Sequence, residues 1–201
     1  MLVLKKVAIT GGLSSGKTSV CEILKKKGAY VISADEIVHQ LLDPQSKIGQ
    51  EIVSLLGEDI LTDTQFNRAL IAKKVFNNTE TLKSLEKILH PAVLEEVEKH
   101  YNQVKDQKKF TLFIAEIPLL YEIESHHLFD TVVTVITDPK TAKRRFQEKT
   151  NHSVQEFENR MAHQLPPAEK SAKADFTIQN DGDFAQLEKQ VETFYHNITQ
   201  E

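Results

Sequence analysis

The sequence lacks the features that define several common classes of protein. It contains one cysteine, Cys21, so no disulfide can form within the chain and a reducing compartment is expected. Acidic residues outnumber basic ones by 29 to 25, and this excess gives no electrostatic reason to expect a nucleic-acid partner. No stretch approaches the roughly 18 apolar residues of a membrane span, and lysines interrupt the first apolar stretch too early for a signal peptide. We therefore expect a cytoplasmic protein without a membrane partner.

Repeats and low-complexity tracts are also absent, and short β-rich stretches alternate with amphipathic helices. This alternation predicts an α/β fold with a parallel sheet, with strands at residues 7–10, 30–33, 111–115, 131–136 and 175–178. Residues 35–101, between the second and third strands, have an almost wholly helical pattern, and Pro91 is expected to break or kink the helix there. The sequence also predicts a final helix from Asp183, whose apolar face comprises Phe184, Leu187, Val191, Phe194 and Ile198.

The most specific local motif is Gly11–Thr18, which matches the phosphate-binding loop pattern G-x-x-x-x-G-K-[ST] between an apolar strand and an amphipathic helix. Glycines let the backbone curl so that N–H groups point at phosphate oxygens, and the helix N-terminus adds a positive field. Lys17 is expected to reach the β- and γ-phosphates, and the Thr18 hydroxyl to ligate Mg²⁺. The predicted nucleotide contacts here are Gly11, Gly12, Leu13, Ser14, Ser15, Gly16, Lys17, Thr18 and Ser19. The motif predicts triphosphate binding but does not separate a kinase from a GTPase or a motor.

Two acidic residues follow or end predicted strands, where parallel sheets bind their ligands. Asp35 comes after the second strand and is suited to orient an attacking hydroxyl and accept its proton. It could also cap the helix that follows, and the two roles are compatible. Glu116 ends the third strand and could order the Mg²⁺ shell through water, or it could merely begin a turn.

Arginine is scarce, with only four among the 25 lysines and arginines. Three of them, Arg144, Arg145 and Arg160, cluster with Lys143 and Lys149. Because arginine grips phosphate in a planar, bidentate way, this cluster indicates a lid that closes over a triphosphate. The alternative is a solvated basic helix face.

Several motifs in order along the chain resemble the dephospho-CoA kinase family over nearly its whole length. They are the phosphate loop Thr10–Lys17, Ala34-Asp35, Leu89-His90-Pro91, Pro118-Leu-Leu-Tyr-Glu122 and Asn180-Asp-Gly182. The phosphate loop alone is generic, whereas the combination of Leu-His-Pro with Pro-Leu-Leu-x-Glu is much more specific.

The resemblance implies a P-loop kinase with a five-stranded parallel sheet, a helical substrate-binding insertion and a lid. It implies transfer of the γ-phosphoryl group of ATP, with Mg²⁺, to the 3′-hydroxyl of dephospho-CoA, which gives coenzyme A. We accordingly expect a nucleotide-binding core of residues 1–34 and 107–201, a lid at about residues 140–172, and an acceptor-binding insertion of residues 35–106.

The same resemblance implies roles for individual residues. Asp35 would meet the 3′-hydroxyl, Arg145 would contact the transferring phosphate beside Lys17, and Asn180 would lie at the adenine. The implied acceptor contacts are Asp35, His39, His90, Pro91 and Leu119, and the implied metal contacts are Thr18 and Glu116. The chain has His39 where the family often has arginine, and Ser14 where glycine is usual.

Three alternatives compete with this assignment. A P-loop kinase of another nucleotide or small metabolite would carry the same phosphate loop. A GTP-dependent switch would need Asn-Lys-x-Asp and Asp-x-x-Gly motifs, and the sequence contains neither. A nucleotide-binding protein without turnover would have no need for the lysine, hydroxyl, carboxylate and lid arginine that this chain retains.

Overall fold

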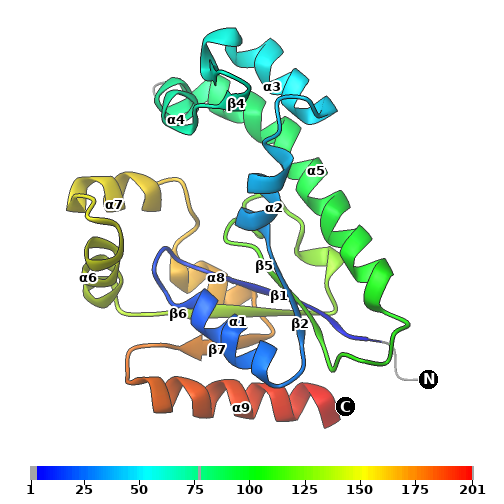
Figure 1. Ribbon diagram of the computed structural model, residues 1–201. Coiled ribbons are helices and arrows are strands. Elements are labelled where there is room, and N and C mark those ends of the chain that lie inside the picture. Colours follow the sequence, from blue (N-terminus) through cyan, green and yellow to red (C-terminus); the bar gives the residue numbers. More distant parts are fainter. Residues whose placement is uncertain (1–3, 77, 201) are drawn as a thin grey trace. The chain divides into compact units, whose positions relative to one another are not determined.

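The computed structural model describes residues 4–76 and 78–200, and the chain divides into two compact units (Figure 1). One unit comprises residues 1–33 and 101–201, and the other comprises residues 34–100. The chain therefore leaves the first unit after its second strand and returns to it near the end of a long helix.

The first unit is built on a parallel sheet of five strands in the order β2-β5-β1-β6-β7. The register places Ala8 of β1 opposite Ala115 of β5 and Val132 of β6. The strands are β1 (Lys6–Gly11), β2 (Tyr30–Ser33), β5 (Phe113–Glu116), β6 (Thr131–Ile136) and β7 (Phe176–Gln179). The predicted five-stranded parallel sheet is confirmed, with strand ends within two residues of those expected from the sequence.

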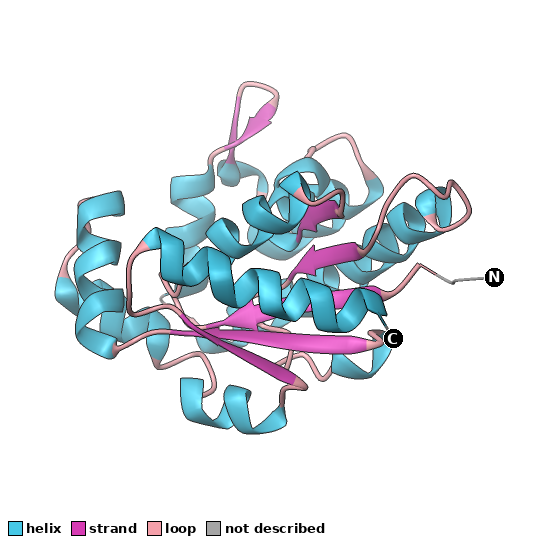
Figure 2. Ribbon diagram, turned by 90° about the horizontal axis from the view of Figure 1, so that it is seen from below, coloured by secondary structure: helices cyan, strands magenta, loops and turns pink. Residues whose placement is uncertain are grey.

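Helices cover both faces of this sheet (Figure 2). Alternate strand residues such as Val7 and Val133 pack against α1 (Lys17–Lys26) and α9 (Phe184–Gln200). The opposite face carries Thr134, whose hydroxyl donates a hydrogen bond to the backbone of α8 (Pro167–Lys173). This arrangement follows from the period of two in a strand, which sends neighbouring side chains to opposite faces.

The apolar face predicted for α9 is correct at four of its five positions, because Leu187, Val191, Phe194 and Ile198 are buried. The prediction for Phe184 is wrong, since 56% of its surface is exposed. Phe184 shares a helical face with Leu187 and Val191 but is the first residue of α9, where the end of the helix leaves it open to solvent.

Two further helices begin directly after residues whose side chains cap them. Helix α6 (Pro139–Thr150) starts after Asp138, whose carboxylate accepts a hydrogen bond from the N–H of Thr141 at 3.0 Å. Helix α7 (Val154–Met161) starts after Ser153, whose hydroxyl accepts from the N–H of Glu156 at 3.2 Å. Both side chains satisfy donors that the first helical turn leaves unpaired.

The second unit is mostly helical but also contains a small hairpin that the sequence reading missed. Its elements are α2 (Ala34–Leu41), α3 (Lys47–Leu56), η1 (Glu58–Ile60), β3 (Leu61–Thr62), β4 (Gln65–Phe66), α4 (Arg68–Phe76) and α5 (Thr79–Val104), whose end belongs to the first unit. Strands β3 and β4 pair antiparallel, and Asp63 in their turn has a φ of +56°. Aspartate tolerates this left-handed conformation, which tight hairpin turns require. The expectation of an almost wholly helical segment was therefore wrong at residues 61–66.

Helix α5 continues through Pro91, so the prediction of a break there is wrong, whereas the alternative of a kink stays a prediction. Proline removes one backbone hydrogen bond, but Leu85 before it and Val93 and Val97 after it are all buried. Burial on both sides stabilises the helix across the missing bond. Although α5 has 26 residues, neither it nor any other helix in the described ranges is apolar enough to cross a membrane.

Candidate active site

The loop between β1 and α1 has the curled backbone that phosphate binding needs. Gly11 and Gly16 have φ angles of +144° and +98°, and Ser14 also lies in the left-handed region at +55°. A Cβ atom on Gly16 would lie only 2.0 Å from the Asn180 amide nitrogen, so a side chain does not fit there. Serine at position 14 adopts a conformation that glycine reaches at lower cost, which explains why a glycine is usual in the family at this position.

Polar groups inside this loop are arranged for an anion. The Lys17 ammonium is buried and donates to the carbonyls of Gly11 and Gly12 at 3.1 and 2.8 Å. The Ser15 hydroxyl is only 2% exposed as a residue and has no hydrogen-bond partner among the described residues. A buried hydroxyl without a partner is costly, and a phosphate oxygen would satisfy it at the N-terminus of α1.

The structure brings together the two residues predicted to contact the metal. The Thr18 hydroxyl, in the first turn of α1, donates to Glu116 Oε1 at 3.2 Å. Glu116 is the last residue of β5, where its backbone pairs with Ile9 and Ser33. A hydroxyl and a carboxylate oxygen on adjacent elements are donors that Mg²⁺ accepts in phosphate-binding sites.

Cys21 lies one turn beyond Thr18 and is buried. Burial, reinforced by the nearby Glu116 carboxylate, raises the pKa of the Cys21 thiol well above its ordinary value. Because the thiolate is the reactive form, we expect native protein at pH 8 to resist thiol-specific reagents and to react fully once unfolded in denaturant. Because Cys21 is the single cysteine, any thiol label must be attached there. Rapid labelling of native protein would contradict the burial.

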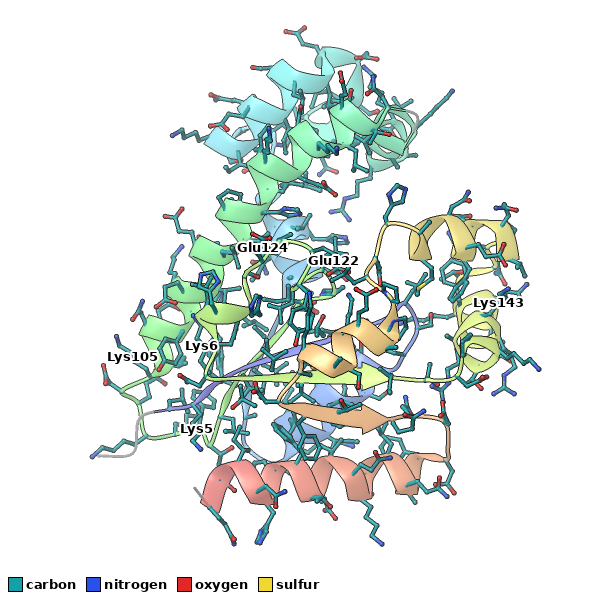
Figure 3. All side chains as sticks on the ribbon, turned by 180° about the vertical axis from the view of Figure 1, so that it is seen from behind. Lys5, Lys6, Lys105, Glu122, Glu124 and Lys143 are labelled. Carbon is teal, nitrogen blue, oxygen red and sulfur yellow. The ribbon has the colours of Figure 1, made fainter. Side chains whose placement is uncertain are left out.

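The helices that follow β6 contact the phosphate loop directly. Leu13 of the loop packs against a cluster formed by Phe146 of α6 and Phe157 of α7. Lys143, labelled on α6 in Figure 3, forms an ion pair with Glu158 of α7 at 2.8 Å. One of the basic residues assigned to the lid therefore joins α6 to α7.

Other residues of the basic cluster differ in their surroundings. Arg160 pairs with Glu156 at 2.7 Å and lies over the Phe146 ring. Arg144 is well exposed, with Glu148 3.9 Å away. Arg145 instead donates to the main-chain carbonyl of Asn180 at 3.0 Å. Asn180 in turn donates its amide to the Ser15 carbonyl at 2.8 Å, so these contacts link Arg145 to the phosphate loop.

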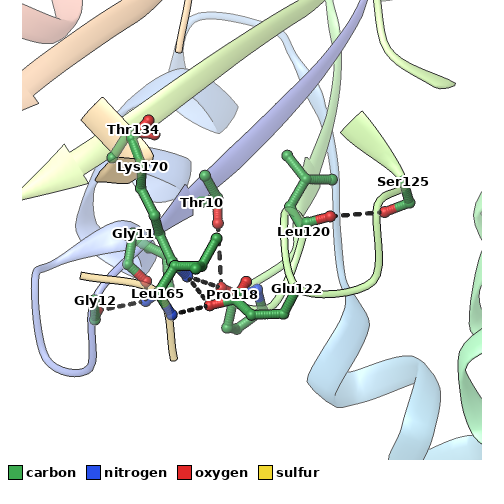
Figure 4. A network of polar contacts seen from close by, with 11 residues as sticks. Thr10, Gly11, Gly12, Pro118, Leu120, Glu122, Ser125, Thr134, Leu165 and Lys170 are labelled. Atoms are coloured by element: carbon green, nitrogen blue, oxygen red, sulfur yellow. Dashed lines mark hydrogen bonds and ion pairs between the residues drawn. The ribbon is translucent and has the colours of Figure 1, made fainter. Parts of the chain in front are cut away.

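The Pro118–Glu122 motif takes part in a buried ion pair and its hydrogen bonds (Figure 4). Lys170 is fully buried, and its ammonium donates to the Pro118 carbonyl and to Glu122 Oε1, both at 2.8 Å. The Thr10 hydroxyl donates to the same carbonyl, and the Leu165 N–H donates to the same carboxylate oxygen. Burial lowers the pKa of Lys170, and the Glu122 carboxylate opposes that shift. The network fastens α8 and the segment before it to the strand that carries the phosphate loop.

In the second unit, Asp35 and His39 are four residues apart on α2, so they share one helix face, and both are exposed. Helix α2 begins at Ala34, so Asp35 lies in its first turn and is not the residue that precedes it. Arg68 of α4 places its Nη1 atom 3.0 Å from His39 Nδ1. Arg68 is the one arginine outside residues 144–160, and no local pattern in the sequence predicts a role for it.

The remaining predicted acceptor residues lie in different units. His90 and Pro91 are on α5, where burial lowers the pKa of His90 and Glu86 opposes the shift. Leu119 is half-buried in the turn after β5 of the first unit.

The parallel sheet, the curled loop between β1 and α1 and the basic helices beside it define a P-loop nucleotide-binding protein. A family model described as dephospho-CoA kinase matches residues 5–186. The chain belongs to the dephospho-CoA kinase family.

Individual relatives agree with that assignment. The chain is 48% identical over 199 residues to a protein named dephospho-CoA kinase from Protochlamydia amoebophila, and the match covers 98% of each sequence. A solved dephospho-CoA kinase from Campylobacter jejuni superposes with a TM-score of 0.72 at 26% identity, covering 96% of both chains. A Thermus thermophilus protein of known structure superposes with a TM-score of 0.82 at 25% identity, covering 97% of this chain and 98% of that one.

Proposed function

We propose that this protein transfers the γ-phosphoryl group of ATP to the 3′-hydroxyl of dephospho-CoA and so forms coenzyme A. The observation that carries the proposal is membership of the dephospho-CoA kinase family along nearly the whole chain. The curled phosphate loop supports it independently, because it holds a buried lysine and a serine hydroxyl that has no partner among the described residues.

The test is a coupled assay of ADP formation with ATP·Mg, in which dephospho-CoA, AMP, adenosine and no acceptor are compared. Turnover that requires dephospho-CoA is the expected result. Equal or faster turnover with another acceptor would replace the proposal with a P-loop kinase of another nucleotide or small metabolite.

The phosphate loop and its neighbours would bind the nucleotide. Lys17 would exchange the carbonyls of Gly11 and Gly12 for phosphate oxygens, and the Ser15 hydroxyl would gain a partner. The oxygen donors of Thr18 and Glu116 fit Mg²⁺ held together with phosphate and water. When bound, Mg²⁺ supplies positive charge that offsets the negative charge of the β- and γ-phosphates.

The acceptor would be held by the helical insertion of residues 35–106 and activated by Asp35. An exposed carboxylate on the first turn of α2 can orient a hydroxyl and accept its proton late in phosphoryl transfer. His39, His90, Pro91 and Leu119 complete the proposed acceptor contacts. Residues 1–34 and 107–201 form the nucleotide-binding core in this proposal, and residues of about 140–172 close over ATP and exclude water.

We further propose that Arg68 and His39 together hold the anionic diphosphate of dephospho-CoA. Arginine binds phosphate in a bidentate manner, and the Arg68 guanidinium lies beside His39, where the family often carries an arginine.

We expect Arg68→Gln to raise the KM for dephospho-CoA about tenfold, with an unchanged KM for ATP. Lys73→Gln, which removes one positive charge from the same helix α4, is the matched control. Equal KM values for dephospho-CoA in both variants and the wild type would exclude this role.

Arg145 is proposed to contact the transferring phosphate, since it is the lid arginine whose contacts lead to the phosphate loop. We expect Arg145→Lys to slow the single-turnover rate at least about tenfold, because a point charge does not reproduce the planar fork. Arg144→Lys on the exposed side of α6 is the control and should react at the wild-type rate. Unchanged single-turnover rates in Arg145→Lys would count against the assignment.

Composition supports the remaining expectations about partners and location. The net charge of −4 and the single cysteine fit a cytoplasmic enzyme with the small-molecule substrates ATP and dephospho-CoA. We propose no nucleic-acid or membrane partner for it.

A further inference from the structure

Asn180, just after β7, is held rigidly against the phosphate loop. Only 6% of its surface is exposed, and its side-chain Nδ2 donates to the Ser15 carbonyl at 2.8 Å. Its own backbone is fixed on both sides: the N–H donates to the Ile136 carbonyl at 2.8 Å, and the carbonyl accepts from Thr137 at 2.8 Å and Arg145 at 3.0 Å. The amide therefore projects from a backbone that has little freedom to move.

The loop is shaped to receive this amide. Gly16 follows Ser15, and a Cβ atom at Gly16 would lie 2.0 Å from the Asn180 amide nitrogen. The two residues are thus in direct contact at the start of α1, and glycine at position 16 both permits the +98° φ angle and leaves room for the amide.

The hydrogen bond to Ser15 has a consequence for the neighbouring peptide group. The carbonyl of Ser15 and the N–H of Gly16 belong to one planar trans peptide, so they point in opposite directions. When Asn180 holds the carbonyl on one side, the Gly16 N–H is directed to the other. Backbone N–H groups that converge are what make a phosphate-binding loop.

We infer that Asn180 is a positioning residue for phosphate binding, which orients the Ser15–Gly16 peptide and acts on the nucleotide through the loop. This inference rests on the proposed function only in that the phosphates of ATP bind at this loop. It differs from a direct contact between Asn180 and adenine, because a residue that orients the loop affects every ligand carrying the phosphate chain, whatever its base.

Competition binding against a fluorescent ATP analogue separates these two roles. The probes are ATP·Mg, GTP·Mg and inorganic tripolyphosphate with Mg²⁺, measured on the full chain. In Asn180→Ala, which removes the amide, we expect the affinity for all three probes to fall by the same factor, of about tenfold or more. An unchanged affinity for tripolyphosphate would overturn the inference, whether or not ATP binding weakens.

A second variant controls for any loss of folding caused by the cavity that alanine would leave at position 180. Asn180→Asp keeps the shape of the side chain and replaces the donor by an oxygen that repels the Ser15 carbonyl, so it should weaken the same three probes together. Asn197→Asp makes the same change of charge on the exposed face of α9 and should leave all three affinities unchanged. Melting temperatures identify the variants that are folded.

These binding measurements need no acceptor, so they are independent of the proposed reaction. If the wild type fails to phosphorylate dephospho-CoA while the Asn180 variants lose tripolyphosphate affinity, the proposed function is wrong and the role of Asn180 stands. If the wild type makes coenzyme A while the variants keep their tripolyphosphate affinity, the inference is wrong and the function stands.

Discussion

Replacing Asp35 with asparagine is expected to lower turnover by roughly 10²–10⁴-fold while leaving the affinity for ATP nearly unchanged. Asparagine keeps the size of the side chain but can neither accept a proton nor carry the charge that orients the acceptor hydroxyl. Asp35 is exposed in the first turn of α2, so the substitution leaves no buried group unpaired and should not affect folding. The measurements are kcat with dephospho-CoA and the Kd for ATP·Mg.

A control is available one residue away. Glu36 is also exposed in the first turn of α2, so Glu36→Gln makes the same change of charge at the same end of the helix. A specific role for Asp35 requires Glu36→Gln to retain near-normal turnover. Near-normal turnover in Asp35→Asn itself would remove Asp35 from the mechanism, and equal losses in both variants would indicate a general electrostatic effect.

Replacing Lys170 with methionine is expected to destabilise the protein by about 3–5 kcal/mol, the usual cost of removing one partner of a buried ion pair. Methionine fills similar space but leaves the Glu122 carboxylate buried, and its Oε2 atom already has no hydrogen-bond partner among the described residues. The Pro118 carbonyl also loses the bond from the ammonium. The loss should be visible as a shift in the midpoint of urea unfolding with an unchanged slope.

The double variant Lys170→Met with Glu122→Gln tests the cause of that loss. Removing the second charge should restore much of the stability, because the uncompensated carboxylate and not the missing ion pair is the main cost. The coupling between the two positions is then obtained from the double-mutant cycle. Additive effects of the two substitutions would contradict the buried pair.

Local signals in the sequence were sufficient for most of the framework. The apolar stretches at residues 30–33 and 131–136 became strands with the predicted ends. Asp138 caps α6, and its pattern is local, because an aspartate before proline satisfies the first turn by itself. The phosphate loop was recognisable because its function depends on glycines and a lysine at fixed spacing.

Features that depend on packing were predicted less well. Of the expected break or kink at Pro91, the break does not occur, because buried residues on both sides hold α5 together and no local signal reports that burial. The contact between Arg68 and His39 spans 29 residues and that between Lys170 and Pro118 spans 52, so only the folded chain brings these groups together. No role for Arg68 or Lys170 was therefore predictable from local sequence patterns.

The candidate site residues divide into a pair that the structure brings together and others whose roles no contact tests. Thr18 and Glu116 come from adjacent elements of the sheet unit, and the prediction that they share a site fits their hydrogen bond. The proposed role of Asp35 rests on its place after the second strand and on family resemblance, whereas those of His39 and His90 rest on resemblance alone, and all three remain predictions.

The most direct test of the central claim is to identify the phosphorylated product formed by the wild-type protein from ATP·Mg and dephospho-CoA. Mass spectrometry and ³¹P NMR would show whether a phosphate is added and which hydroxyl carries it. The proposal predicts coenzyme A, with the new phosphate on the ribose 3′-oxygen and one ADP formed for each coenzyme A. Formation of ADP without coenzyme A, or a phosphate at another position, would contradict it.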